Sequence, residues 1–142
     1  MLYTELTKKA MQICFDAHKD QVDKAGLPYV FHPMHLAEQM TDEASVCTAL
    51  LHDVIEDTEM TIADLAAAGF PAEILRAVEL VTHKDNESYW QYISDIKADP
   101  IARAVKLADL HHNSDLSRLS QVDEWALARV ERYRKAIEML SE

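Results

Sequence analysis

Apolar residues recur along the chain at the spacing of α-helices. In the first such segment, Leu6, Ala10, Ile13 and Ala17 lie three or four positions apart, so one face of a helix would be apolar. Later segments repeat this period and are separated by glycine, proline or a capping residue. The pattern predicts about eight helices, at residues 4–18, 32–40, 42–56, 61–68, 71–81, 87–97, 100–113 and 123–141.

Polar residues mark several of the predicted helix ends. Asp42 and Asp123 stand where a side chain can cap a helix N-terminus. Thr61 and Asp64 resemble a capping box with Asp in place of Glu, and Gly69 is a suitable end for that helix. Glycine occurs only twice and proline four times in 142 residues. We therefore expect an all-α fold, a single helical domain over residues 1–142.

The charge and hydropathy of the chain exclude several classes of protein. A formal net charge of −11 repels nucleic acid backbones and anionic lipid surfaces, so we expect neither as a partner. No apolar stretch reaches the length of a membrane span, and the N-terminal residues lack the apolar core of a signal peptide. Cys14 and Cys47 stand apart among apolar residues, as reduced buried thiols do. Together these features predict a cytoplasmic protein.

One short stretch, LLHDVIEDT at residues 50–58, concentrates ionisable side chains directly after an apolar run. On a continuous helix, His52, Asp53 and Glu56 would share or border one face, close to the buried leucines. A buried ionised carboxylate is costly unless it is paired or binds a metal, so a divalent cation is one explanation. The other is an ordinary His–Asp pair exposed to water at a helix end, because the dipeptide is common.

Two residues far from this stretch in the sequence favour a bound divalent cation over an exposed His–Asp pair. His32 begins a predicted helix, and Asp109 follows Val105 by one helical turn on an apolar face. With His52 and Asp53 they offer two nitrogen and two carboxylate ligands, and this set leaves coordination positions for water and substrate. Oxygen and imidazole ligands without thiolate suit Mn²⁺, Fe²⁺ or Mg²⁺ better than a structural zinc site.

The same residues carry a resemblance to a known family. The motifs HKDQ, PYVFHP, HDVIEDT and VKLADLHHN occur in this order between residues 18 and 113. The chain resembles the HD-domain metal-dependent phosphohydrolases. Within them it is most similar to the hydrolase domain of the Rel/SpoT-type alarmone enzymes and to the small stand-alone alarmone hydrolases. The resemblance implies an HD-type helical bundle, a bound Mn²⁺, and removal of the 3′-pyrophosphate from guanosine penta- or tetraphosphate (ppGpp).

The resemblance also assigns roles to residues of this chain. It implies four metal ligands: His32, His52, Asp53 and Asp109. Glu56 and Asp57 match the acidic pair beside the hydrolytic water and are the catalytic candidates. Independently of the resemblance, a carboxylate one helical turn beyond His52 could accept a proton from a bound water.

The substrate-binding candidates come from the second half of the chain. By the resemblance, Asn113 contacts the substrate, and Arg129 and Tyr133, four apart on the last helix, face the nucleotide. Lys84 lies near a lysine of the family. Ordinary alternatives stay open: Arg129 could simply pair with carboxylates, and Tyr133 could simply be a core residue, with no role in binding substrate. His112, which also matches a family position, could serve packing alone.

One departure from the family concerns the substrate. The alarmone hydrolases carry Arg two residues after the Gln of the first motif, whereas this chain has Asp23. An acid in place of a cation near a pyrophosphate changes the Coulomb energy by a few kcal/mol at short range. The adjacent Lys24 could supply the missing charge as a substrate-binding residue, although Lys24 and Lys106 would each more often be solvated. Replacing Asp23 by Arg is therefore expected to leave activity unchanged or to raise it.

Three functions stay open from the sequence. The first is an alarmone 3′-pyrophosphohydrolase. The second is an HD phosphohydrolase of another nucleotide, such as a phosphorylated nicotinamide dinucleotide or a nucleoside monophosphate. The third is a noncatalytic nucleotide sensor, which would more readily have lost Glu56 or Asp57. Each would act on or bind a small nucleotide, as a monomer or a homodimer.

Overall fold

The computed structural model describes all 142 residues, and its regular structure is helical. The helices are α1 (Glu5–His18), α2 (Phe31–Glu38), α3 (Glu43–Leu51), α4 (Val54–Asp57), α5 (Ile62–Ala67), α6 (Ala72–Val81), α7 (Tyr89–Lys97), α8 (Pro100–Asn113), the 3₁₀ helix η1 (Leu116–Arg118) and α9 (Glu124–Ser141). The only β-type pairing is an isolated bridge between Val22 and Pro28. The predicted all-α fold is confirmed.

The predicted caps begin the helices they were assigned to. The carboxylates of Asp42 and Asp123 accept hydrogen bonds from the backbone of the first turns of α3 and α9. Thr61 and Asp64 bond reciprocally as a capping box at α5. Each cap satisfies backbone N–H groups that have no partner within the helix. Local polar signals therefore fix these helix starts.

The predicted helix over residues 42–56 is wrong in one respect, because it is two helices. The helix α3 ends at Leu51, and Asp53 has φ −110° and ψ 1°, outside the helical region. A single further turn, α4, begins at Val54. This break changes the direction of the chain at the His–Asp pair, so His52 and Asp53 do not continue the surface of one helix.

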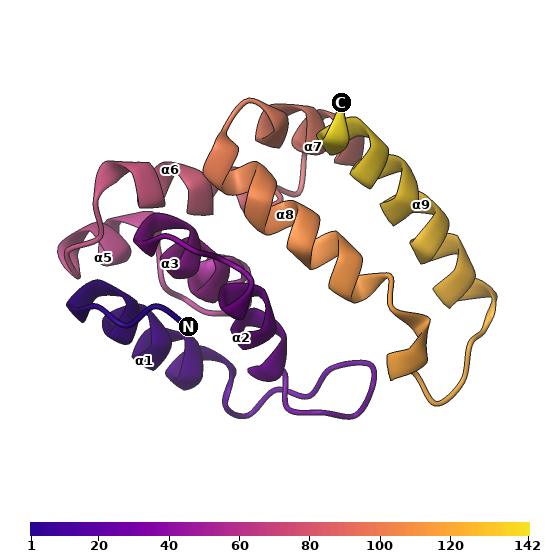
Figure 1. The fold of residues 1–142 in the computed structure, drawn as a ribbon, viewed down its shortest axis with the longest axis horizontal. Coiled ribbons are helices and arrows are strands. Elements are labelled where there is room, and N and C mark those ends of the chain that lie inside the picture. The colour runs from indigo at the N-terminus through magenta and orange to yellow at the C-terminus, as the bar shows by residue number, and fades with distance from the viewer.

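The core consists of two clusters of apolar side chains. The larger one gathers α1, α2, α3 and α5, and the smaller one gathers α7 and α9. Both α6 and α8 contribute to each cluster: Val105 of α8 belongs to the first, and Leu110 belongs to the second. Figure 1 shows α8 crossing the molecule between α1–α3 and α9. Residues on α8 can therefore meet residues from both halves of the chain.

None of the helices combines the length and apolar character needed to cross a bilayer.

Candidate metal centre and nucleotide pocket

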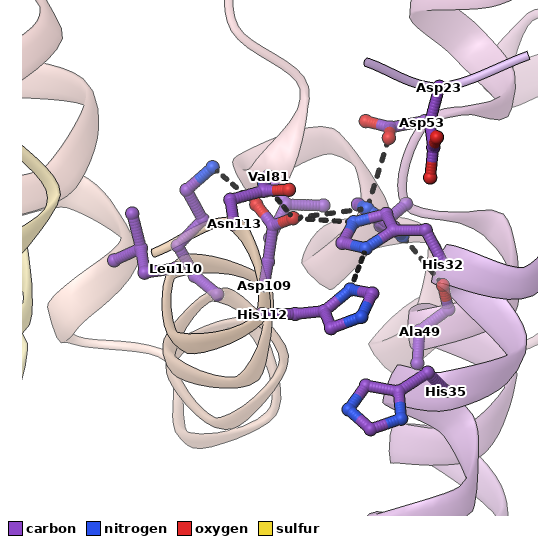
Figure 2. A network of polar contacts seen from close by, with 12 residues as sticks. Asp23, His32, His35, Ala49, Asp53, Val81, Asp109, Leu110, His112 and Asn113 are labelled. Carbon is purple, nitrogen blue, oxygen red and sulfur yellow. Dashed lines mark hydrogen bonds and ion pairs between the residues drawn. The ribbon is translucent and has the colours of Figure 1, made fainter. Parts of the chain in front are cut away.

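Three of the four expected metal ligands meet in the interior. His32 lies on α2, His52 follows the last residue of α3, and Asp109 lies on α8. All three are buried, and one nitrogen or oxygen atom of each lies within 4.8 Å of the others. Figure 2 shows His32 and Asp109 converging from opposite sides of the site. The arrangement brings together residues 77 positions apart in the chain.

The imidazole of His52 is oriented by its own helix. Its Nδ1–H donates a hydrogen bond to the carbonyl oxygen of Ala49, 2.7 Å away, so Nε2 carries the free lone pair. Nε2 is buried and makes no hydrogen bond of good geometry, although Asp53 Oδ2 lies 3.1 Å away and Asp109 Oδ1 lies 3.7 Å away. A buried nitrogen lone pair facing two carboxylates without a hydrogen bond fits a metal ligand.

His32 is held in the same way by a second histidine. Its Nε2 lies 2.8 Å from Asp109 Oδ1, and its Nδ1 lies 2.7 Å from Nδ1 of His112. The two rings stack with centroids 4.9 Å apart. Burial and the neighbouring His32 lower the pKa of His112 to about 4, so His112 is neutral and can accept a hydrogen bond from His32 Nδ1–H. His112 therefore orients a ligand, which the sequence left open as packing.

Asp109 is surrounded by donors. Its Oδ2 accepts a hydrogen bond from Lys106 Nζ at 2.8 Å, and its Oδ1 accepts one from Asn113 Nδ2 at 3.0 Å. Burial alone would raise the pKa of Asp109, but the Lys106 ammonium and the neighbouring His32 and His52 outweigh it and hold the pKa well below the usual range. The carboxylate is therefore ionised. Lys106, expected to be solvated, is instead a mostly buried partner of this carboxylate.

Asp53 stands beside the cluster rather than in it. It lies outside the group of three whose ligand atoms approach one another within 4.8 Å. Its Oδ2 accepts a hydrogen bond from the hydroxyl of Tyr29 and faces His52 Nε2. Burial opposes ionisation, but His52 and the Tyr29 hydrogen bond lower the pKa of Asp53 to about 2. Asp53 is thus a charged carboxylate within reach of the cluster. It is held in place by Tyr29, which lies in the PYVFHP motif but received no role from the sequence.

The two expected catalytic carboxylates have different surroundings. Glu56 Oε1 accepts a hydrogen bond from the backbone N–H of His83 at 2.6 Å, while its other oxygen has no protein donor. Desolvation raises the pKa of Glu56, the His83 N–H opposes this, and Asp53 adds to the rise, so the net pKa is raised. Asp57 lies 3.8 Å from the buried His18 Nδ1. Of the two carboxylates, only Glu56 lines the cavity that Asp53 and Asp109 also line.

Two cavities adjoin at the site. The smaller, of about 130 Å³, is lined by Asp53, Glu56 and Asp109. The larger, of about 340 Å³, lies between the loop after α1 and the segment from η1 to α9. Asn113 and Tyr133 line both. The combined space can hold a ligand whose reacting group lies at the cluster and whose remainder lies in the larger cavity.

Four of the five expected substrate-binding residues line these cavities. Lys24 and Arg129 line the larger one, and Asn113 and Tyr133 lie where the two meet. Lys84 does not: it is exposed and lines a separate shallow pocket on the outer side of Glu56. Arg132, which has no motif around it, also lines the smaller cavity, with its guanidinium 4.7 Å from the ring centre of Tyr89.

Asp23, which stands where the family has an arginine, has a cationic partner in the structure. Its Oδ2 accepts a hydrogen bond from the guanidinium of Arg118, 3.0 Å away. Arg118 comes from η1, 95 residues later in the chain. Because the pairing is long-range and Arg118 lies outside the family motifs, no local pattern could have found it. An Arg at position 23 would face Arg118 and would repel it.

The fold and the site define a class: a helical protein in which histidine and carboxylate side chains from α2, the end of α3 and α8 form a buried cluster that could hold a metal ion. The HD domain family matches residues 10–137 of the chain. The chain therefore belongs to this family.

Known relatives agree with this assignment. The mouse guanosine-3′,5′-bis(diphosphate) 3′-pyrophosphohydrolase MESH1 is 36% identical over 84% of this chain and 74% of its own length. A GTP pyrophosphokinase of Myxococcus xanthus is 33% identical over 89% of this chain. The chain spans only 19% of that larger protein. Among solved structures, a metazoan ortholog of SpoT, described as hydrolysing ppGpp, superposes with a TM-score of 0.80 at 23% identity. The superposition covers 99% of this chain and 88% of the other.

Proposed function

We propose that this protein is a divalent-metal-dependent phosphohydrolase that removes the 3′-diphosphate of guanosine 3′,5′-bis(diphosphate) or of the corresponding pentaphosphate. The observation that carries the proposal is the lining of one small cavity: Asp109 of the metal cluster, Asp53, Glu56 and Asn113 meet there. The similarity to MESH1 along most of both chains supports the choice of substrate.

The ligand set favours a particular class of metal. His32, His52 and Asp109 would hold the ion, with Asp53 as a fourth ligand from beside the cluster. We assign Mn²⁺, because imidazole and carboxylate ligands without thiolate suit it. A bound divalent cation supplies a water of lowered pKa and polarises a phosphoryl oxygen. Every other part of the chemistry comes from side chains of this chain.

Glu56 is the general base in this proposal. Its Oε1 is held by the His83 N–H, its second oxygen has no protein donor, and Glu56 lines the small cavity. Its raised pKa brings it closer to neutral pH, where a base is more effective. Asp57 acts as a positioning residue, since it contacts buried His18 rather than the cavity. His18 in turn lies 3.0 Å from Gln21, at the start of the loop that forms the larger cavity.

The remaining residues bind the substrate. Lys24 and Arg129 have no ion-pair partner in the protein and lie on the wall of the larger cavity, so they can neutralise phosphate charge. This matters in a chain of net charge −11. Asn113 and Tyr133, shared by both cavities, would hold the substrate across the junction. Lys84 could reach only the outer side of Glu56.

A second candidate rests on Asp23. An acid in place of the family's Arg, here paired with Arg118, alters the wall of the larger cavity. This favours hydrolysis of another nucleotide by the same metal site. In either case we place the enzyme in the cytoplasm, which agrees with two free, buried cysteines.

The test is a hydrolysis assay with identified products. Protein stripped with a chelator is reloaded with Mn²⁺ and incubated with guanosine 3′,5′-bis(diphosphate), and the products are separated by ion-exchange chromatography. The proposal requires guanosine 5′-diphosphate and pyrophosphate in equal amounts, and none from the Asp109→Asn variant. Failure on this nucleotide together with hydrolysis of another 3′-phosphorylated nucleotide would favour the second candidate.

A further inference from the structure

A mostly buried ion pair joins two distant segments at the wall of the larger cavity. Asp23, in the loop between α1 and α2, pairs with Arg118 of η1 at 3.0 Å. Their side chains are only 10% and 21% exposed. An ion pair so removed from water is costly to desolvate unless its groups are well bonded, so its presence on a ligand-sized cavity calls for an explanation.

Asp23 is fixed by its own loop. Its Oδ1 accepts hydrogen bonds from the backbone N–H groups of Ala25, at 2.8 Å, and Leu27, at 3.0 Å. Its backbone N–H donates to the carbonyl oxygen of Leu27, and Gly26 supplies the positive φ of 83° that the turn needs. The carboxylate therefore has a set position before any ligand arrives.

Arg118 is fixed just as firmly. One terminal nitrogen donates to Asp23, and the other donates to the carbonyl oxygen of His112 at 3.0 Å. A guanidinium has five N–H donors, so Arg118 keeps donors without a protein partner, and it lines the larger cavity. The pair thus presents donors at a fixed place on that wall.

The charge balance indicates what this wall recognises. Asp23 and Arg118 neutralise each other, so the pair adds little net attraction for a phosphate. Lys24 and Arg129 on the same cavity have no such partner and are the better phosphate ligands. A neutral group with acceptors suits the pair better. Among nucleobases, the O6 and N7 acceptors of guanine match an arginine fork, whereas adenine presents a donor beside its acceptor.

We propose that the Asp23–Arg118 pair reads the nucleobase and selects guanine over adenine. This inference rests on the proposed function, because it assumes that a nucleotide occupies the larger cavity while its 3′-diphosphate lies at the metal cluster. Arg118 contacts the base, and Asp23 holds Arg118 in place. No motif in the sequence marks Asp23 and Arg118 as residues that recognise a base.

The discriminating experiment compares two substrates that differ only in the base. The ratio of kcat/KM for guanosine 3′,5′-bis(diphosphate) to that for adenosine 3′,5′-bis(diphosphate) is measured for wild type and for Arg118→Gln. The ratio should fall roughly 5- to 150-fold in Arg118→Gln, because a glutamine amide suits adenine better than guanine. Lys24→Gln should lower both values and leave their ratio unchanged. Arg134 is an exposed arginine of α9 that lines neither cavity, so Arg134→Gln should leave the kcat/KM values for both nucleotides unchanged.

The positioning role of Asp23 has its own variant. Asp23→Asn keeps an oxygen that can accept from Ala25 and Leu27 but removes the charge that holds Arg118. The ratio of kcat/KM for the guanosine substrate to that for the adenosine substrate should fall in Asp23→Asn, as it should in Arg118→Gln. If both variants lose activity equally on the two nucleotides, the pair serves the fold or the phosphates, and the inference is overturned.

A binding measurement separates this inference from the proposed function. Guanosine 5′-diphosphate and adenosine 5′-diphosphate are titrated into wild type and Arg118→Gln by calorimetry, without any hydrolysis. Tighter guanosine binding by wild type, and its loss in the variant, supports the base-reading role even in a protein that cleaves neither bis(diphosphate). Equal binding of both nucleotides by wild type overturns it.

Discussion

Individual side chains at the metal centre depend on neighbours that immobilise them. The carbonyl of Ala49 orients His52, the ring of His112 orients His32, and Lys106 and Asn113 bond to Asp109. These contacts determine which nitrogen or oxygen atom of each side chain remains available to bind a metal. Such supporting contacts matter because a metal site tolerates little error in distance or angle.

Glu56 gives the sharpest prediction at this scale. Glu56→Gln keeps the size of the side chain and its bond with the N–H of His83 but cannot accept a proton. Turnover should fall by about 10²–10⁴, while the metal content measured by atomic absorption stays at the wild-type level. The matched control is Glu59→Gln, which alters an exposed residue outside the cavities and should have wild-type turnover. Near-normal turnover of Glu56→Gln would assign the base to another group.

The two cysteines give a prediction about reactivity. Burial, together with a neighbouring acid in each case, raises the pKa of Cys14 and of Cys47 to about 12. A raised thiol pKa means less thiolate, on the order of 10⁻⁴ of each thiol at pH 8. A chromogenic disulfide reagent should therefore label neither cysteine at pH 8 in the native protein and both after denaturation in guanidinium chloride. Rapid labelling of the native protein would show that one thiol is accessible.

At the scale of elements, α8 is the helix on which the site depends. It carries Lys106, Asp109, His112 and Asn113 within two turns, and it packs against both core clusters. The break between α3 and α4 has the complementary effect, since it turns His52 and Asp53 toward α8. The positions of a few helix ends therefore determine the geometry of the centre.

The contribution of the α8 N-terminal cap to stability can be measured without changing a residue of the site. Asp99 Oδ1 accepts hydrogen bonds from Ile101 N and Ala102 N, both at 3.0 Å. Asp99→Ala should lower the free energy of unfolding by about 0.5–2 kcal/mol, because a capping carboxylate is lost. The measurement is urea denaturation followed by circular dichroism. Asp20→Ala, which removes an exposed carboxylate that caps nothing, should leave stability unchanged. Activity of Asp99→Ala should persist at temperatures where the variant is folded.

At the scale of the whole molecule, the centre connects the two halves of the chain. Ligands from α2 and α3 meet a ligand from α8, and Asp23 meets Arg118 across the same junction. In Figure 1, the loop after α1 lies below the end of α8, on the side of η1. Stability and ligand binding should therefore be coupled.

Metal binding should stabilise the folded protein as a whole. Mn²⁺ at a hundred times its dissociation constant should raise the free energy of unfolding by about 2.7 kcal/mol, provided that the unfolded chain does not bind it. Thermal unfolding with and without a chelator measures this. In Asp109→Asn the increase should disappear, whereas Asp95→Asn, an exposed carboxylate on α7, should retain it. An equal increase in all three proteins would mean that Mn²⁺ binds elsewhere.

The sequence by itself determined most of the helices, their caps and the candidate metal ligands. Helical periodicity and capping are local properties, so they can be read from neighbouring residues. The order of the motifs identified His32, His52 and Asp109 without a structure. Only the tertiary structure decided how these residues meet. It ended α3 before Asp53 and paired Lys106 with Asp109. It also brought Arg118 to Asp23 across 95 residues. Such pairings depend on packing between distant segments, and no pattern along the chain encodes them.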